Sequence, residues 1–306
     1  MALAPTIDPM VRAAEVVARA GSATLKVHRP HDGAAGGRHV GSRRGGGVEF
    51  AEHREYHQGD DLRHLDWRAY ARSDRLLVKR FETEVHSELR IVVDGSASMA
   101  FDDEALGRGV DKLDAVRLLA AALATVAVSA GDAVSLTIPN QASLGARAGR
   151  PALLAVLSAL VALRGEGDDA HCGLGALRLD KSERAPASVV ALSDGLDAPE
   201  TLLTTLAAWR RGGADVVLVQ TLHPLELDFD FPDAVALRCD ERDTGIVHDP
   251  RRLREDARAM MTSHLAATRS AALAVGIRYH MLALGGDAAA ALRVVLGLLA
   301  VPRGLR

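Results

Sequence analysis

The chain has 306 residues, of which 48% are hydrophobic and only 3% are aromatic. This length allows a large core built mainly from Ala, Val and Leu. The formal charge of -3 shows no basic bias, which argues against nucleic acid as a partner. Two cysteines, Cys172 and Cys239, in a chain of this length indicate a reducing compartment.

The sequence shows no sign of a membrane or export segment. Its first residues lack a basic region followed by a long apolar run, so no signal peptide is expected. The apolar stretches at 118–130 and 289–301 are too short to span a bilayer and are predicted to be buried helices. We therefore expect a cytoplasmic protein without a transmembrane segment.

The first part of the chain is irregular in composition. A helix is predicted over residues 6–21, and the glycine-rich, basic residues 31–47 are typical of an extended loop. Residues 48–84 then mix charged and aromatic side chains densely. We interpret residues 1–87 as an N-terminal extension that carries this segment.

From residue 88 the pattern alternates between apolar strands and helices. Strands are predicted at 88–94, 132–139, 187–194, 214–222 and 277–284, with a further short one at 234–240. Helices are predicted at 111–130, 150–163, 199–211, 250–275 and 287–300. This order predicts an α/β domain over residues 88–306, with a doubly wound, mainly parallel sheet covered by helices on both faces.

One predicted strand end carries a set of oxygen ligands. Asp94 follows the apolar run "RIVV", and Ser96 and Ser98 come at alternate positions after it. A turn after the strand can bring the three oxygens towards one point, and hard oxygen ligands suit Mg²⁺ or Mn²⁺. Asp194 ends the next-but-one strand and could reach the same ion directly or through water.

The spacing of Asp94, Ser96 and Ser98 resembles the metal-ion-dependent adhesion site of von Willebrand factor A domains. The "LSDG" stretch that contains Asp194 resembles the third element of that site, and Cys172 falls where the family usually has a threonine. The resemblance implies a Rossmann-like fold and a metal ion whose open position takes a carboxylate from a partner protein.

The upstream segment resembles the bacterial family called domain of unknown function 58, in which a von Willebrand A-like domain follows such a signature. The matching positions are Glu49, Phe50, Arg54, Tyr56, Gly59, Asp60, Asp61, Arg63, Asp66, Trp67, Ala71 and Arg72, with Leu65 in an isoleucine place. Members are commonly associated with MoxR-type AAA+ ATPases. The resemblance thus implies an adaptor, not an enzyme, that works with such an ATPase in chaperone-like assembly or activation of a client.

The charged segment has a structural interpretation of its own. Arginine forks match carboxylates in bidentate pairs, so an ion-pair network is predicted among Arg54, Arg63, Arg72, Asp60, Asp61 and Asp66, accompanied by Tyr56 and Trp67. Such a network would hold the segment in place and shape a docking surface.

Two alternatives to the adaptor stay open. Asp94 could act as the nucleophile of a metal-dependent hydrolase or phosphatase, although Ser96 stands where such phosphatases usually have their general acid. The protein could also be a structural subunit whose metal site is not functional, which Cys172 would favour because a neutral thiol is a poor Mg²⁺ ligand.

Overall fold

A computed structural model describes residues 9–21, 48–57, 65–73, 75–83, 87–101, 111–166, 172–178, 186–231 and 250–300 of the chain. The chain divides into two compact units. One unit consists of residues 30–86, and the other combines residues 1–29 with residues 87–306. Residues 9–21 therefore belong to the same unit as the sheet, whereas the sequence analysis assigned them to an N-terminal extension over residues 1–87.

The smaller unit is built on a β-hairpin and one short helix. Strand β1 (Val48–Glu55) pairs antiparallel with β2 (Leu77–Thr83), and α2 (Trp67–Ser73) lies between them in the chain. The helix begins after Asp66, whose Oδ1 accepts hydrogen bonds from the backbone nitrogens of Arg68 and Ala69 at 3.0 and 3.1 Å. This carboxylate therefore caps the helix N-terminus.

The larger unit contains a six-stranded sheet in the order β5-β4-β3-β6-β7-β8. All neighbouring strands are parallel except β5, which runs antiparallel to β4 at one edge. The strands are β3 (Glu88–Val93), β4 (Ala133–Ile138), β5 (Ala142–Arg147), β6 (Ser188–Ser193), β7 (Asp215–Leu222) and β8 (Arg278–Ala283).

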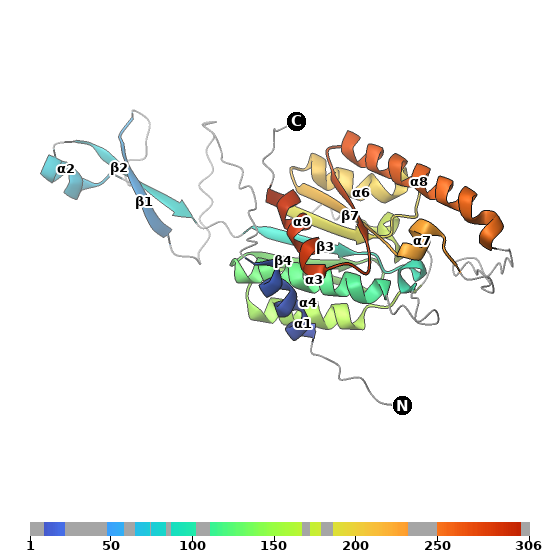
Figure 1. Ribbon diagram of the computed structural model, residues 1–306. Coiled ribbons are helices and arrows are strands. Elements are labelled where there is room, and N and C mark those ends of the chain that lie inside the picture. The colour runs from blue at the N-terminus through green and yellow to red at the C-terminus, as the bar shows by residue number, and fades with distance from the viewer. Residues whose placement is uncertain are drawn as a thin grey trace. The chain divides into compact units, whose positions relative to one another are not determined.

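Helices cover both faces of this sheet (Figure 1). One apolar core lies under α1 (Pro9–Ala20), α3 (Lys112–Ser129), α4 (Arg150–Ala162) and α9 (Ala288–Ala300). The second core lies under α6 (Pro199–Arg211) and α8 (Pro250–Ala274). Short helical turns are η2 (Ala97–Ala100), η4 (Leu174–Ala176) and α7 (Pro224–Asp228). The predicted doubly wound, mainly parallel sheet is confirmed.

Helix α1 is an integral layer of the larger unit. Its Ala13, Val16 and Ala20 are buried in the first core, where α1 packs against α3 and α9. Arg12 donates to both carboxylate oxygens of Asp114 in α3, at 3.0 and 2.7 Å. The helix therefore covers apolar surface that the sheet domain would otherwise leave bare.

The other differences between the elements predicted from the sequence and those observed are local. Strand β5 was not predicted, because most of its residues are exposed and its sequence, "ASLGAR", has neither a β-branched run nor strict alternation. The strand predicted at 234–240 lies outside the described residues. Among the helices that the structure describes, none combines the length and the apolar character needed to cross a bilayer.

Candidate functional site

The candidate site lies where the strand order of the sheet reverses. From β3 the chain passes through α3 to β4 on one side, whereas β6 pairs with β3 on the other side. Ligand sites of open α/β sheets occur at this switch point, beyond the carboxyl ends of the strands. Asp94 follows β3 and Asp194 follows β6, so both predicted acidic residues stand at the reversal.

The oxygens of Asp94, Ser96 and Ser98 converge as predicted from their spacing. Asp94 is 2% exposed, and its Oδ1 accepts hydrogen bonds from the backbone nitrogen of Ser96 at 2.9 Å and from the Ser96 hydroxyl at 2.6 Å. The hydroxyls of Ser96 and Ser98 lie 3.1 Å apart. The turn after β3 thus gathers one carboxylate and two hydroxyls in one place.

A residue that the sequence analysis missed completes this cluster. Ser193, the last residue of β6, donates from its hydroxyl to Asp94 Oδ2 at 2.6 Å. The same hydroxyl accepts a hydrogen bond from the backbone nitrogen of Gly195 at 2.9 Å. Both oxygens of Asp94 therefore have partners, and the carboxylate is fixed from two neighbouring strands.

The oxygen cluster fits a small divalent ion. Mg²⁺–oxygen distances of about 2.0–2.1 Å place adjacent ligands of an octahedron about 2.9 Å apart. The observed separations of 2.6 Å between Asp94 and Ser96 and 3.1 Å between Ser96 and Ser98 lie on either side of that value. Among the described residues, no three His, Cys, Asp or Glu side chains are grouped to hold a metal. A metal at this cluster would therefore need the serine hydroxyls as ligands.

Burial makes the charge of Asp94 costly. It raises the pKa of Asp94 to about 7, with a further contribution from the charge of Asp194, although hydrogen bonds from Ser193 and Ser96 oppose the rise. Near neutral pH this carboxyl therefore holds a proton readily. A cation beside it would displace that proton and favour the carboxylate.

Asp194 has a partner inside the protein. Its Oδ2 accepts a hydrogen bond from the ammonium of Lys112 at 2.8 Å, and these side chains are 1% and 0% exposed. The same ammonium donates to Glu226 Oε1 at 2.8 Å. Neither Lys112 nor Glu226 was singled out from the sequence, because 82 and 114 residues separate Lys112 from its two partners.

Within this buried trio, Lys112 pairs with both carboxylates. Burial lowers the pKa of Lys112, but the charges of Asp194 and Glu226 outweigh that effect and raise it above its ordinary value. Burial raises the pKa of Glu226, and Lys112 offsets only part of that rise. Removing one member of such a buried pair typically costs about 3–5 kcal/mol, because it leaves an uncompensated charge.

The position of Glu226 is fixed by a capping box at the start of α7. The backbone nitrogen of His223 donates to Glu226 Oε2 at 2.7 Å, and His223 Nδ1 accepts from the backbone nitrogen of Leu225 at 3.1 Å. The Glu226 side chain is 15% exposed. Three separate chain segments, the start of α3, the end of β6 and α7, therefore meet at the Lys112 ammonium.

Side chains from β7, β8 and α8 hold the turn after β6 in place. Gln220 Nε2 donates to the carbonyl of Asp194 at 2.8 Å, and Tyr279 in turn donates to Gln220 Oε1 at 2.7 Å. His264 Nε2 lies 2.6 Å from the carbonyl oxygen of Gly195. Gly195 has a φ of +62°, a left-handed conformation that favours glycine.

Cys172 lies close to the backbone of the site. It is buried, its thiol is free, and its carbonyl accepts a hydrogen bond from the Gly95 nitrogen at 3.1 Å. Gln141, after β4, donates to the Gly95 carbonyl at 3.2 Å. Two neighbouring segments therefore hold the backbone of the Asp94–Ser98 loop at Gly95.

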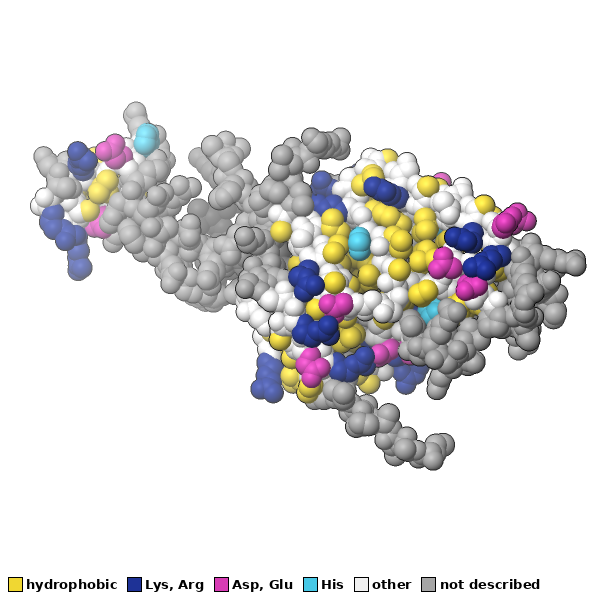
Figure 2. All heavy atoms as spheres, in the orientation of Figure 1, with side chains coloured by type: hydrophobic (Ala, Val, Ile, Leu, Met, Phe, Trp, Pro, Cys, Tyr) yellow, Lys and Arg dark blue, Asp and Glu magenta, His cyan; other side chains and the backbone are white. Residues whose placement is uncertain are grey.

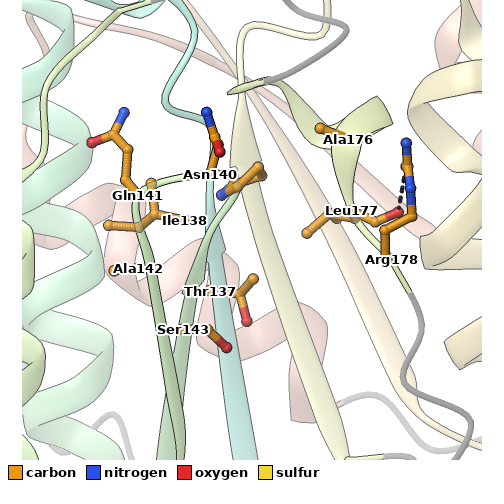
Figure 3. A pocket seen from close by; sticks show the side chains of 10 residues that line it. Thr137, Ile138, Asn140, Gln141, Ala142, Ser143, Ala176, Leu177 and Arg178 are labelled. Carbon is orange, nitrogen blue, oxygen red and sulfur yellow. Dashed lines mark hydrogen bonds between the residues drawn. The ribbon is translucent and has the colours of Figure 1, made fainter.

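A hollow of about 350 Å³ lies at the turn between β4 and β5 (Figure 3). Its walls are the ends of β4 and β5 with the turn between them, and residues 176–178 after η4. Arg178 is the charged residue among its lining, and its guanidinium donates to the Leu177 carbonyl at 3.1 Å.

The face of the protein turned to the viewer in Figure 2 mixes basic, acidic and hydrophobic side chains.

The signature residues are only partly described. Asp60, Asp61 and Arg63, and the side chain of Arg54, lie outside the described part, so the ion-pair network stays a prediction. Of the others, Tyr56 is half-buried and Trp67 is 63% exposed, with its ring edge-to-face to Tyr70. Asp66 caps α2, and Arg72 Nε donates to the Arg68 carbonyl at 3.1 Å.

Fold and site together define an α/β protein with a strand-end oxygen cluster. The sequence profile of the family described as "Protein of unknown function DUF58" matches residues 52–271, and the chain belongs to this family. It is 28% identical over 253 residues to the uncharacterized protein Rv1480 of Mycobacterium tuberculosis strain H37Rv. That alignment covers 79% of this chain and 76% of the relative.

Solved structures show a more distant likeness. BatB from Bacteroides thetaiotaomicron is 15% identical with a TM-score of 0.42, covering 70% of this chain and 98% of the other. The von Willebrand factor A domain of SpRpn10 is 11% identical with a TM-score of 0.38, covering 71% and 99%. Likenesses at these identities and scores carry no functional inference.

Proposed function

We propose that this protein is a non-enzymatic, metal-dependent binding module. Asp94, Ser96 and Ser98 would hold Mg²⁺ or Mn²⁺, and an open coordination position would take a carboxylate from a partner protein. The observation that carries the proposal is the convergence of these three oxygens at the switch point of the sheet. The ion would supply a fixed positive charge there.

The chain's own residues would prepare that position. Ser193 and the Ser96 nitrogen hold the Asp94 carboxylate in one orientation, and Gln141 and Cys172 hold the backbone of the loop. Burial of Asp94 and Ser96 keeps bulk water from competing for the carboxylate. The site would therefore be ordered before a partner arrives, which lowers the entropic cost of binding.

The proposed partner is a MoxR-type AAA+ ATPase or its client, in the cytoplasm. Membership of the DUF58 family supports this choice, because the ATPase association is what the resemblance to that family implies. The protein would then act as an adaptor in chaperone-like assembly or activation of the client.

Co-precipitation with a MoxR-type ATPase from the same organism tests the proposal. We expect capture in the presence of Mg²⁺, and loss of capture with a chelator or in the Asp94→Asn variant. The control Ser143→Ala changes an exposed serine of β5 and should retain capture. Capture that is indifferent to chelator and to Asp94→Asn would contradict the proposed function.

A further inference from the structure

We infer that Lys112 is a positioning residue that withholds Asp194 from the metal, so that the ion is held by one protein carboxylate, Asp94, instead of two. The inference rests on the proposed metal-binding function and refines it. It assigns to Lys112 the role of an internal cation, permanently paired with the second acid of the site. The following observations support this role.

The Lys112–Asp194 pair is anchored at both ends. Lys112 begins α3, where Asp111 caps the helix by accepting from the Asp114 nitrogen at 2.8 Å, and the Lys112 nitrogen donates to the Phe101 carbonyl at 3.3 Å. Asp194 is held through its carbonyl by Gln220 at 2.8 Å. Neither residue can swing away without disturbing a helix start or the turn after β6.

Burial makes the ammonium depend on its partners. The Lys112 side chain is fully buried, and its ammonium lies 2.8 Å from a carboxylate oxygen of Asp194 and 2.8 Å from one of Glu226. If Asp194 turned to an ion, the ammonium would keep Glu226 but lose its more deeply buried partner. A metal that attracted the Asp194 oxygen would also have to approach the ammonium, and the two cations repel each other.

The pairing sets the charge that a partner encounters. The Lys112 ammonium pairs with Asp194 and Glu226, and Asp94 is the third carboxylate of the cluster. The ionised cluster therefore carries two net negative charges, which a single divalent ion neutralises. Without Lys112, the loaded site would keep one net negative charge and would repel an incoming carboxylate. The internal ammonium therefore suits a site that captures acidic residues.

Metal titration of four forms tests the inference: wild type, Lys112→Met, Asp194→Asn and the double variant. Mg²⁺ affinity is measured by calorimetry, and Mn²⁺ binding by electron paramagnetic resonance. Lys112→Met frees Asp194 for the ion, so we expect Mg²⁺ affinity to rise about tenfold, as an added carboxylate ligand would cause. Asp194→Asn should leave the affinity close to wild type, and the double variant should lose the gain.

Each outcome separates this inference from the proposed function. If wild type binds metal but folded Lys112→Met binds it equally or more weakly, the inference fails and the proposed function stands. If Lys112→Met does not fold, Asp194→Asn decides, because a loss of affinity of tenfold or more would show that Asp194 is a ligand. If wild type binds no metal, the proposed function is refuted together with the inference that rests on it, whether or not Lys112→Met binds.

Discussion

The hydroxyl of Ser193 donates to Asp94 Oδ2 at 2.6 Å and so ties the carboxyl end of β6 to that of β3. The two residues are 99 positions apart in the chain. This hydrogen bond joins the two halves of the sheet at the point where the strand order reverses. It fixes the orientation of the carboxylate that the proposed metal site depends on.

Replacing Ser193 with alanine should destabilise the protein at pH 8. Hydrogen bonds to charged groups typically contribute about 1.5–3 kcal/mol, and the Gly195 nitrogen would also lose its acceptor. We expect the free energy of unfolding to fall by about this amount in chemical denaturation. The control Ser143→Ala, on the exposed edge strand, should change it by less than about 0.5 kcal/mol. Equal effects of the two substitutions would contradict the role assigned to Ser193.

Asp94→Asn should abolish metal binding without lowering the stability of the metal-free protein. The amide has nearly the shape of the carboxyl and removes a buried charge, so the metal-free variant should unfold at the same temperature as wild type or higher. Added Mg²⁺ should raise the unfolding temperature of wild type only, because a ligand that binds the folded state stabilises it. Thermal unfolding with and without Mg²⁺ measures both effects. An equal Mg²⁺ shift in both proteins would place the ion elsewhere.

Stability without metal should decrease as the pH rises. The pKa of Asp94 is about 7 in the folded protein against an ordinary value of 3.8, so the folded state holds this proton more tightly. The contribution of Asp94 is fully present below pH 3.8 and is lost as the pH rises through about 7. Denaturation of metal-free protein across this range should show the decrease in wild type and a smaller one in Asp94→Asn.

The same proton should govern metal affinity with the opposite sign. An ion binds the carboxylate and not the protonated acid, so Mg²⁺ affinity should increase as the pH rises through about 7. Calorimetric titration at several pH values measures this dependence. An affinity that is constant over this range would show that Asp94 is not a ligand.

Gly195→Ala should lower the free energy of unfolding more than Gly131→Ala, although both glycines have a left-handed backbone conformation. A Cβ at Gly195 would lie 2.9 Å from Gln220 Nε2, whereas one at Gly131, with a φ of +81°, would meet nothing within 4 Å. Gly131→Ala should therefore lower the free energy of unfolding only by the cost of a left-handed residue with a Cβ, about 1–2 kcal/mol. The extra loss in Gly195→Ala, measured by denaturation, reports the packing of the turn after β6. Equal losses would show that Gln220 moves aside freely.

Much of the fold could be predicted because its strands and helices have strong local signals. β6 and β7 are fully buried and rich in Val and Leu, and α6 begins with proline and ends before glycine. The hairpin of β1 and β2 could not be recognised, because its sequence is dense in charge. The place of α1 in the core also depends on contacts with α3 and α9 that no local pattern records.

In the candidate site, too, the sequence predicts what lies within one turn but not what depends on distant segments. Asp94, Ser96 and Ser98 lie within one turn, so their spacing in the chain predicts their convergence. The environment of Asp194 depends on Lys112, which looks in the sequence like an ordinary solvated residue at the start of a helix. Its burial follows only from the way α3, β6 and α7 meet in space.

The packing of α1 bears on how this protein can be shortened for study. A fragment starting at residue 87 would include every strand of the large sheet, yet it would lack the layer formed by Ala13, Val16 and Ala20. The uncovered apolar sides of α3 and α9 would then promote self-association during recombinant expression. A shortened form should instead retain residues 1–29 and rejoin them to residue 87 through a designed linker, omitting only residues 30–86.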